Sequence, residues 1–270
     1  MQARIVSGAQ GGQWLIDGWR MFRAAPLGWL ALVFAYWFLM TVASLVPFLG
    51  IVLASALVPA FSVGFMAAAR AASRGAPVEL SLLFDGFRHD RRAMVLLGLA
   101  YFACLAFVLA GSALADNGAL ARWMLSGARP DEAVLQSDAF VGALALASLL
   151  YVPVMAAFWF APPLAAWHST GAAKALFFSF VGCLLNWRPF LVYGAVTALV
   201  TLVIPMVLLM ALMLWLGDAG KVPVAGLAFP LLLMILPILF ASFYASYRDV
   251  FGQMSGQMNG QMSGQPDRSK

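Results

Sequence analysis

The sequence predicts an all-α integral membrane protein in which six transmembrane helices form three hairpins, each preceded by an amphipathic helix at the cytoplasmic interface. Composition gives the first reason, because 63% of the 270 residues are hydrophobic and only 10% are charged. An ordinary soluble domain has about 25% charged residues. The second reason is that several charge-free apolar runs reach about 20 residues, enough for a helix to cross a hydrocarbon core of about 30 Å. The third is that basic residues concentrate in alternate loops between these runs.

The apolar runs place six spans, and the first two come from one long run. Residues 27–69 contain no charged residue and are too long for a single crossing. Because Pro47 and Gly50 favour a tight turn, we expect two helices there. The alternative is one helix followed by a re-entrant segment. The predicted spans are residues 27–46, 50–69, 93–115, 139–162, 190–216 and 224–246.

The distribution of Lys and Arg predicts that both termini lie in the cytoplasm. In that orientation the cytoplasmic segments hold 13 of the 16 basic residues and the outer loops hold the other 3. Basic residues are enriched in cytoplasmic loops, so this bias favours N-terminus and C-terminus inside. The polar N-terminal residues show no removable signal peptide, so we expect the first span to be an uncleaved anchor. The net charge of +5 favours anionic lipid headgroups as partners, and we expect no nucleic-acid partner.

Two nine-residue stretches of the chain are nearly the same, LIDGWRMFR at residues 15–23 and LFDGFRHDR at residues 83–91. In the first, Leu15, Trp19 and Phe22 recur at helical spacing, and the second repeats this pattern. A one-sided apolar face beside a bilayer is typical of a helix that lies in the interface. We therefore expect two anchoring helices. Residues 173–190 show the same spacing without the Asp-Gly pair and predict a third.

These helices divide residues 1–252, a single six-helix membrane domain, into units of about residues 10–69, 79–162 and 172–246. Each unit is an interfacial helix followed by two spans, so the units would be parallel repeats. True triplication and a merely shared layout both remain open. Residues 253–270 repeat Gly, Gln, Met and Ser and are predicted to be a disordered tail. Their methionines suit Cu(I), but without His or Cys a neutral low-complexity expansion is the better interpretation.

The sequence favours no catalytic, cofactor or metal site. Every Asp, Glu, Lys, Arg and His falls outside the six predicted span cores, which disfavours a proton-coupled pump. The chain has two histidines, His89 and His168, and lacks His-Glu-x-x-His and paired-Cys spacing. Cys104 and Cys183 are not expected to pair. We therefore expect a protein that is not an enzyme and uses no cofactor.

Basic residues beside the amphipathic helices are the candidate binding residues. In one interpretation, the aspartate of each Asp-Gly pair only forms a solvated ion pair with the arginine three residues later, as Asp17 does with Arg20. Such an ion pair is worth about 0.3 kcal/mol. In the other, the arginines form a cytoplasmic basic surface for lipid phosphates or a protein partner. The candidates for lipid or partner binding are Arg20, Arg23, Arg88, Arg91, Arg92, Trp187 and Arg188.

Several short motifs are similar to those of a known family. They are Trp14, Asp17, Gly18, Trp19 and Arg23 with Pro26, then PFLG at 47–50, APPL at 161–164, AL-x-x-S at 175–179, NWRPF at 186–190 and YRDVF at 247–251. Through them the chain resembles an uncharacterised family of proteobacterial six-span integral membrane proteins, distantly similar to the membrane portion of some glycerophosphodiester phosphodiesterases. The resemblance covers residues 10–252 and implies a bacterial inner-membrane location and this topology. It implies no activity, since the phosphodiesterase catalytic domain is absent from the sequence.

Two hypotheses about function follow. The first is a non-enzymatic inner-membrane protein with a structural, regulatory or partner-binding role, in contact with anionic lipids and with a membrane protein partner or a second copy of itself. The alternative is a transporter or channel for a small or lipidic solute, lined by polar groups of bent helices. A membrane-embedded enzyme ranks third.

Overall fold

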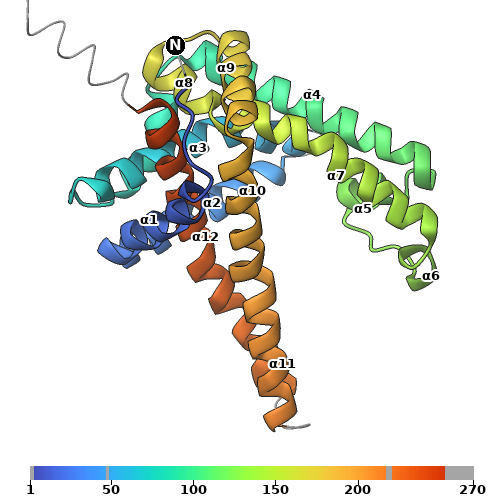
Figure 1. Cartoon of the computed structure of the whole chain (residues 1–270). Coiled ribbons are helices and arrows are strands. Elements are labelled where there is room, and N and C mark those ends of the chain that lie inside the picture. Colours follow the sequence, from blue (N-terminus) through green and yellow to red (C-terminus); the bar gives the residue numbers. More distant parts are fainter. Residues whose placement is uncertain (1–2, 47–48, 217–220, 253–270) are drawn as a thin grey trace, which may run out of the picture. The chain divides into compact units, whose positions relative to one another are not determined.

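The computed structural model describes residues 3–46, 49–216 and 221–252, and helices account for 85% of it (Figure 1). No strand occurs in the described ranges. There, six helical segments are long and apolar enough to cross a membrane: Pro26–Ser44, Gly50–Ser73, Arg91–Asp116, Asp138–His168, Trp187–Leu212 and Leu233–Phe251. The all-α class and the six candidate spans are thus confirmed, while the arrangement as three hairpins stays a prediction. The predicted tail, residues 253–270, lies outside the described residues.

The helices follow one another through short connections. Each predicted span overlaps one candidate span, although several boundaries differ by a few residues. The elements in chain order are α1 (Gln10–Ala24), α2 (Pro26–Ser44), α3 (Gly50–Ser73), η1 (Leu80–Phe87), α4 (Arg91–Asp116), α5 (Ala119–Ser126), α6 (Glu132–Leu135), α7 (Asp138–Trp159), α8 (Ala161–His168), α9 (Ala172–Leu185), α10 (Trp187–Ala198), η2 (Leu199–Val203), α11 (Ile204–Leu216) and α12 (Lys221–Phe251).

The long apolar run is broken where the sequence predicts a break. Helix α2 ends at Ser44 and α3 begins at Gly50, so residues 27–69 form two helices. Helix α2 begins at Pro26, whose fixed φ suits the first helical position and whose missing N–H is not needed there. The corner before it is fixed by Trp29, which is fully buried and donates its indole N–H to the carbonyl oxygen of Met21 at 3.1 Å.

The second of the two similar stretches forms a 3₁₀ helix, η1, and not an α-helix like α1. Beyond η1 the stretch contains Arg91, the first residue of α4, and just before it the N-cap residue of that helix, Asp90. Its Oδ1 accepts the backbone N–H of Ala93 at 3.1 Å, which satisfies one of the free donors at the helix start. Residues 83–91 therefore end one element and begin another.

Helices α10 and α11 are joined by a turn of π-helix, η2, without a loop between them. Pro205 explains this wider turn, because proline has no N–H and its ring clashes with the carbonyl four residues earlier. That carbonyl belongs to Thr201, whose hydroxyl donates to the carbonyl oxygen of Thr197 at 2.8 Å. Pro205 therefore accounts for the π turn between α10 and α11.

Two compact units make up the chain, and the first contains Met1–Leu39, Phe61–Asp85 and Val181–Lys270. Within it, α1 packs against α10 and α12. Trp14, Trp29 and Phe251 are among its largest buried side chains. The rings of Phe65 and Phe240 are stacked, with centroids 4.0 Å apart and an interplanar angle of 2°.

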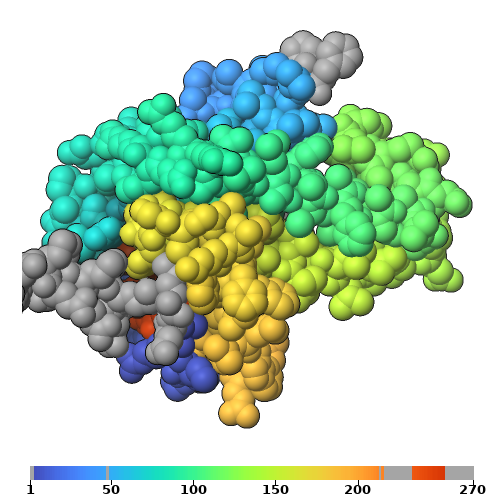
Figure 2. Space-filling view, turned by 90° about the horizontal axis from the view of Figure 1, so that it is seen from above, coloured from blue at the N-terminus to red at the C-terminus, as the bar shows by residue number. Residues whose placement is uncertain are grey.

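The second unit contains Met40–Ala60 and Gly86–Phe180, and its main packing is between α4 and α7. In Figure 2, α4 appears as a continuous band of teal to green atoms on the visible face. The hydroxyl oxygens of Tyr101 and Tyr151 lie 3.2 Å apart and join the two helices. At the far end of α4, the Asp116 carboxylate accepts the N–H of Leu120 at 2.7 Å, so it caps α5.

The candidate spans expose apolar side chains that a soluble protein would bury. In the most apolar window of the Trp187–Leu212 span no residue is buried. Leu202, Met206 and Leu208 there are each more than 60% exposed. A continuous apolar surface of this kind is stable when hydrocarbon surrounds it.

Candidate functional site at the junction of α1 and α12

Helix α1 is attached to the first unit by one buried face. Its buried residues include Gly11, Trp14, Gly18 and Phe22, which recur at intervals of three or four. Leu15 and Phe22, predicted to face the membrane interface, lie instead on this face buried against protein, whereas Trp19 is 40% exposed. The apolar face of α1 thus contacts protein, namely α10 and α12.

Two glycines let α1 approach its neighbours closely. A Cβ atom on Gly18 would lie 2.5 Å from the carbonyl oxygen of Ile238 in α12, a distance that real Cβ atoms essentially never show. A Cβ atom on Gly11 would collide with the carbonyl of Pro189 in α10. Because these obstacles are backbone atoms, they cannot rotate away as side chains do. The glycines therefore fix α1 at backbone-contact distance.

Trp14 connects the apolar and polar parts of this junction. Its ring lies 5.3 Å from that of Phe190 and 5.8 Å from that of Tyr193, in tilted arrangements favoured by aromatic pairs. Its indole N–H donates to Oδ2 of Asp249 at 3.0 Å. The side chain is fully buried, so this hydrogen bond supplies the partner that a buried indole needs.

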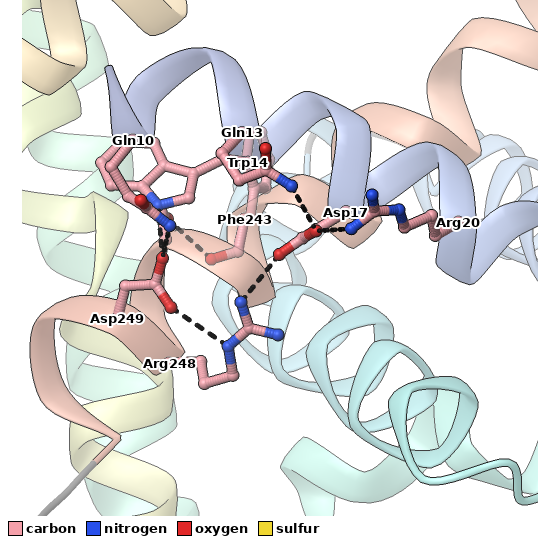
Figure 3. Close-up of polar contacts among 9 residues, drawn as sticks. Gln10, Gln13, Trp14, Asp17, Arg20, Phe243, Arg248 and Asp249 are labelled. Carbon is pink, nitrogen blue, oxygen red and sulfur yellow. Dashed lines mark hydrogen bonds and ion pairs between the residues drawn. The ribbon is translucent and has the colours of Figure 1, made fainter. Parts of the chain in front are cut away.

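Two carboxylates and one arginine link α1 to the end of α12 (Figure 3). Arg248 donates from Nη2 to Asp17 at 2.8 Å and from Nε to Asp249 at 3.1 Å. Asp17 also accepts Gln13 at 3.0 Å, and Asp249 accepts Gln10 at 2.6 Å. Both carboxylates are largely buried, and each is neutralised by several donors, so they join the helices without leaving an unpaired charge.

The N-terminal segment before α1 is also fixed by hydrogen bonds. The backbone N–H of Arg4 donates to the carbonyl of Val250 at 2.9 Å, one of the last carbonyls of α12 that have no partner within the helix. The buried Asn186 accepts the N–H of Val6 at 2.9 Å and donates to the carbonyl of Arg4 at 3.0 Å. Its amide thus pairs with the segment as a strand backbone would.

An open groove lies where this segment meets the end of α12. Its volume is about 600 Å³, within the usual range for small-molecule sites. Arg4, Gln10 and Arg248 contribute donors to its lining, and Asp249 contributes a carboxylate. The remaining lining residues are Ile5, Val6, Ser7 and Gly252.

The predicted binding residues fall in both units. In the first unit, Arg20 forms the predicted ion pair with Asp17 at 3.2 Å with its side chain 63% exposed, and Arg23 is also exposed. Trp187 and Arg188 are exposed too, with the Arg188 guanidinium 5.4 Å from the indole centroid. In the second unit the exposed arginines are Arg88, Arg91 and Arg92. Whether any of these seven residues binds a ligand stays a prediction.

Sequence reasoning did not single out the residues that line the groove. Arg4 belonged only to the count of basic residues, and Arg248 and Asp249 only to the motif YRDVF. The motifs YRDVF and NWRPF were a signal, since they bring Arg248, Asp249 and Asn186 to this junction. The pairing of Asn186 with Arg4 and of Arg248 with Asp17 could not be derived, because these partners lie more than 180 residues apart in sequence.

The described part of the chain offers little for metal or thiol chemistry. Cys104 and Cys183 are both free thiols. No group of three or more His, Cys, Asp or Glu residues in the described ranges could hold a metal ion. Burial raises the pKa of the Cys183 thiol to about 12, because the thiolate would lose its hydration. The Cys183 thiol is therefore protonated and unreactive near neutral pH.

The six apolar helices, with their exposed hydrocarbon-like surfaces, define a multi-pass membrane protein. The chain is 43% identical over 203 residues to a probable inner membrane protein of Burkholderia thailandensis, covering 72% of this chain and 74% of that protein. The chain therefore belongs to the family of this inner membrane protein. No family model matches the sequence, and no solved structure is similar to it. None of these findings links the chain to glycerophosphodiester phosphodiesterases.

Proposed function

We propose that the protein is a non-enzymatic structural component of the inner membrane that holds anionic lipid headgroups at its cytoplasmic surface. The observation that carries the proposal is the docking of α1. One face of this helix is fixed to α10 and α12 by Trp14, Gly18 and the Asp17–Arg248 ion pair. The other face leaves the arginines at positions 20 and 23 exposed and available to phosphate groups.

Both termini lie in the cytoplasm in this proposal. The hydrogen bond from Arg4 to Val250 supports it, because the segment before the first span and the end of the last span meet in one unit. Such a meeting requires an even number of crossings. The concentration of 13 of 16 basic residues in the segments on that side favours the cytoplasm over the exterior.

The interfacial position of α1 is the second part of the proposal. Ile16 is 48% exposed, Trp19 is 40% exposed, and both lie on the same outward side as Arg20 and Arg23. A helix surface that combines exposed apolar rings with arginines suits the boundary between acyl chains and headgroups. We propose interfacial positions for η1 and α9 as well, since each precedes a pair of spans in the three-hairpin arrangement.

Lipid retention tests the role of the basic surface. The full chain would be placed in nanodiscs containing phosphatidylglycerol and phosphatidylcholine, and the lipids kept after gentle detergent extraction would be counted by native mass spectrometry. We expect replacement of Arg20 and Arg23 by Gln, and separately of Arg88, Arg91 and Arg92, to lower phosphatidylglycerol retention about fivefold in each case, which corresponds to a loss of roughly 1 kcal/mol of binding free energy.

The matched control replaces Arg122 and Arg129, which are predicted to lie outside, and should change phosphatidylglycerol retention less than twofold. Equal retention by both Gln variants and the unchanged protein at low salt would contradict a headgroup-binding surface. The alternative role as a transporter or channel gains no support from the groove, which lies at the helix ends, not midway along the spans.

A further inference from the structure

We infer that the groove between the N-terminal segment and the end of α12 is a binding site for a phosphate-type oxyanion, held by Arg4 and Arg248. This site goes beyond the basic surface proposed above, because neither arginine belongs to that surface. It consists of residues of a single unit, from two segments that are joined by the Arg4–Val250 hydrogen bond.

The balance of donors and acceptors in the groove selects an anion. Each oxygen of the Asp249 carboxylate already accepts a hydrogen bond, Oδ1 from Arg248 and Oδ2 from Gln10 and Trp14. Arg248 uses Nε and Nη2 in its two ion pairs, which leaves the N–H groups of Nη1. The groove therefore has donors to spare, and its one carboxylate is occupied.

Arg4 supplies the larger share of these donors. Its side chain is exposed, lines the groove and has no ion pair within the described ranges. Its backbone is nevertheless fixed, because its N–H donates to the carbonyl of Val250 and its carbonyl accepts the side-chain amide of Asn186. A guanidinium offers five N–H donors in a planar fork that fits two oxygens of a phosphate. A fixed backbone with an unengaged fork is the arrangement that such recognition requires.

The negative end of the α12 dipole would oppose an anion here, but the structure weakens this effect. The carbonyl of Val250 accepts the N–H of Arg4, and that of Arg248 accepts the N–H of Gly252, each at 2.9 Å. Arg248 pairs with Asp17 as well as Asp249, and Asp17 also pairs with Arg20, so three arginines (Arg4, Arg20 and Arg248) stand against two carboxylates; the charge at the groove still favours an anion. A volume of about 600 Å³ accommodates a phosphate group together with the atoms esterified to it.

Two sources present this chemistry, a free phosphate and the headgroup of an anionic lipid, and one experiment separates them. The full chain, purified in an uncharged detergent, would be titrated with inorganic phosphate by calorimetry. In a second arm, phosphatidylglycerol would be added and bound lipid counted by native mass spectrometry. Neither arm depends on which side of the membrane the groove faces.

Arg4→Gln should weaken binding about tenfold in at least one arm, as expected for the loss of a charge-assisted contact. Arg4→Lys should weaken it less, about threefold, because the charge remains and the fork is lost. The matched control is Arg74→Gln, which removes an exposed arginine of the same unit away from the groove and should change binding less than twofold.

Weaker binding of inorganic phosphate by Arg4→Gln assigns the site to free anions. Weaker binding of phosphatidylglycerol alone assigns it to lipid headgroups. Equal binding by Arg4→Gln and Arg74→Gln in both arms would overturn the site. Arg4 makes no side-chain ion pair with the residues that the structure describes, so its replacement should leave the thermal midpoint unchanged. If Arg4→Gln does unfold the chain, the comparison of Arg4→Lys with Arg74→Lys decides the matter in the same way. The nanodisc experiment on the arginines of the second unit has a separate outcome, so either proposal can fail alone.

Discussion

The two similar stretches of the chain, residues 15–23 and 83–91, pack alike but fold differently. They share five of nine residues, and in both the glycine of the Asp-Gly pair lies against a helix backbone. Gly18 meets Ile238 of α12, and Gly86 meets Ala60 of α3. Yet the first stretch lies in a 15-residue α-helix, and the second lies partly in an eight-residue 3₁₀ helix. The shared pattern therefore provides close approach to a neighbouring helix and does not determine the type of helix.

The flanking residues account for the difference in helix length. Helix α1 runs for 15 residues up to Ala24, and Ala25 ends it because the residue before a proline, here Pro26, disfavours helical backbone angles. The 3₁₀ helix η1 is preceded by Pro77, and the residue before a proline disfavours helical backbone angles. It is followed by Asp90, which caps α4. The residues between these signals, 78–89, leave room for a helix of at most 12 residues, which is shorter than the 15 of α1.

The largest effect should come from Gly18→Ala, which tests close approach in the first stretch. The new Cβ would meet the Ile238 carbonyl, so α1 must move away, at a cost of about 3 kcal/mol. We expect a lower thermal midpoint and roughly 100-fold faster tryptic cleavage after Arg20 and Arg23. The control is Gly12→Ala, because a Cβ there would have no atom within 4 Å. Its higher helix propensity should stabilise the fold by about 0.5–1 kcal/mol. Equal cleavage of both variants would show that α1 is not held by this contact.

A smaller effect should come from Gly86→Ala, the same change in the second stretch. A Cβ there would collide with the carbonyl of Ala60, but η1 is short and can shift, so we expect about 2 kcal/mol. The measurement is tryptic cleavage after Arg88 and Arg91, with Gly142→Ala, an open position of the same unit, as the control. Should Gly86→Ala cleave no faster than Gly142→Ala, the two stretches would not share a packing role.

The smallest effect should come from Asp17→Asn, which tests the long-range ion pair that distinguishes the first stretch. Arg248 is 41% exposed in this pair, so solvent screening limits the loss to about 1 kcal/mol. We expect a small drop in thermal midpoint at low salt that shrinks at high salt. Glu132→Gln breaks a local pair whose side chains are both more than 65% exposed and should leave the midpoint unchanged. A drop of the same size in both variants would mean that the link to α12 adds nothing.

The sequence was a good guide wherever the determining signal is local. Pro47 and Gly50 interrupt the long apolar run, and the helices end and begin around them. The predicted ion pair of Asp17 with Arg20 is present because residues three apart on a helix are neighbours. The same local reasoning gave an interfacial face to Trp19 with Leu15 and Phe22, whereas the structure buries Leu15 and Phe22 against protein and leaves Trp19 partly exposed. Helical periodicity identifies a face but not its partner.

By itself, the sequence determined that this protein belongs in a membrane and where its six candidate spans lie. Hydropathy and length suffice for that, since a bilayer imposes one solvent requirement on every segment. Only the tertiary structure decided that Asp17 pairs with Arg248, 231 residues away, and that Arg4 and Arg248 line one groove. Such pairings depend on which helices become neighbours, and the packing of backbones at Gly11 and Gly18 settles that choice.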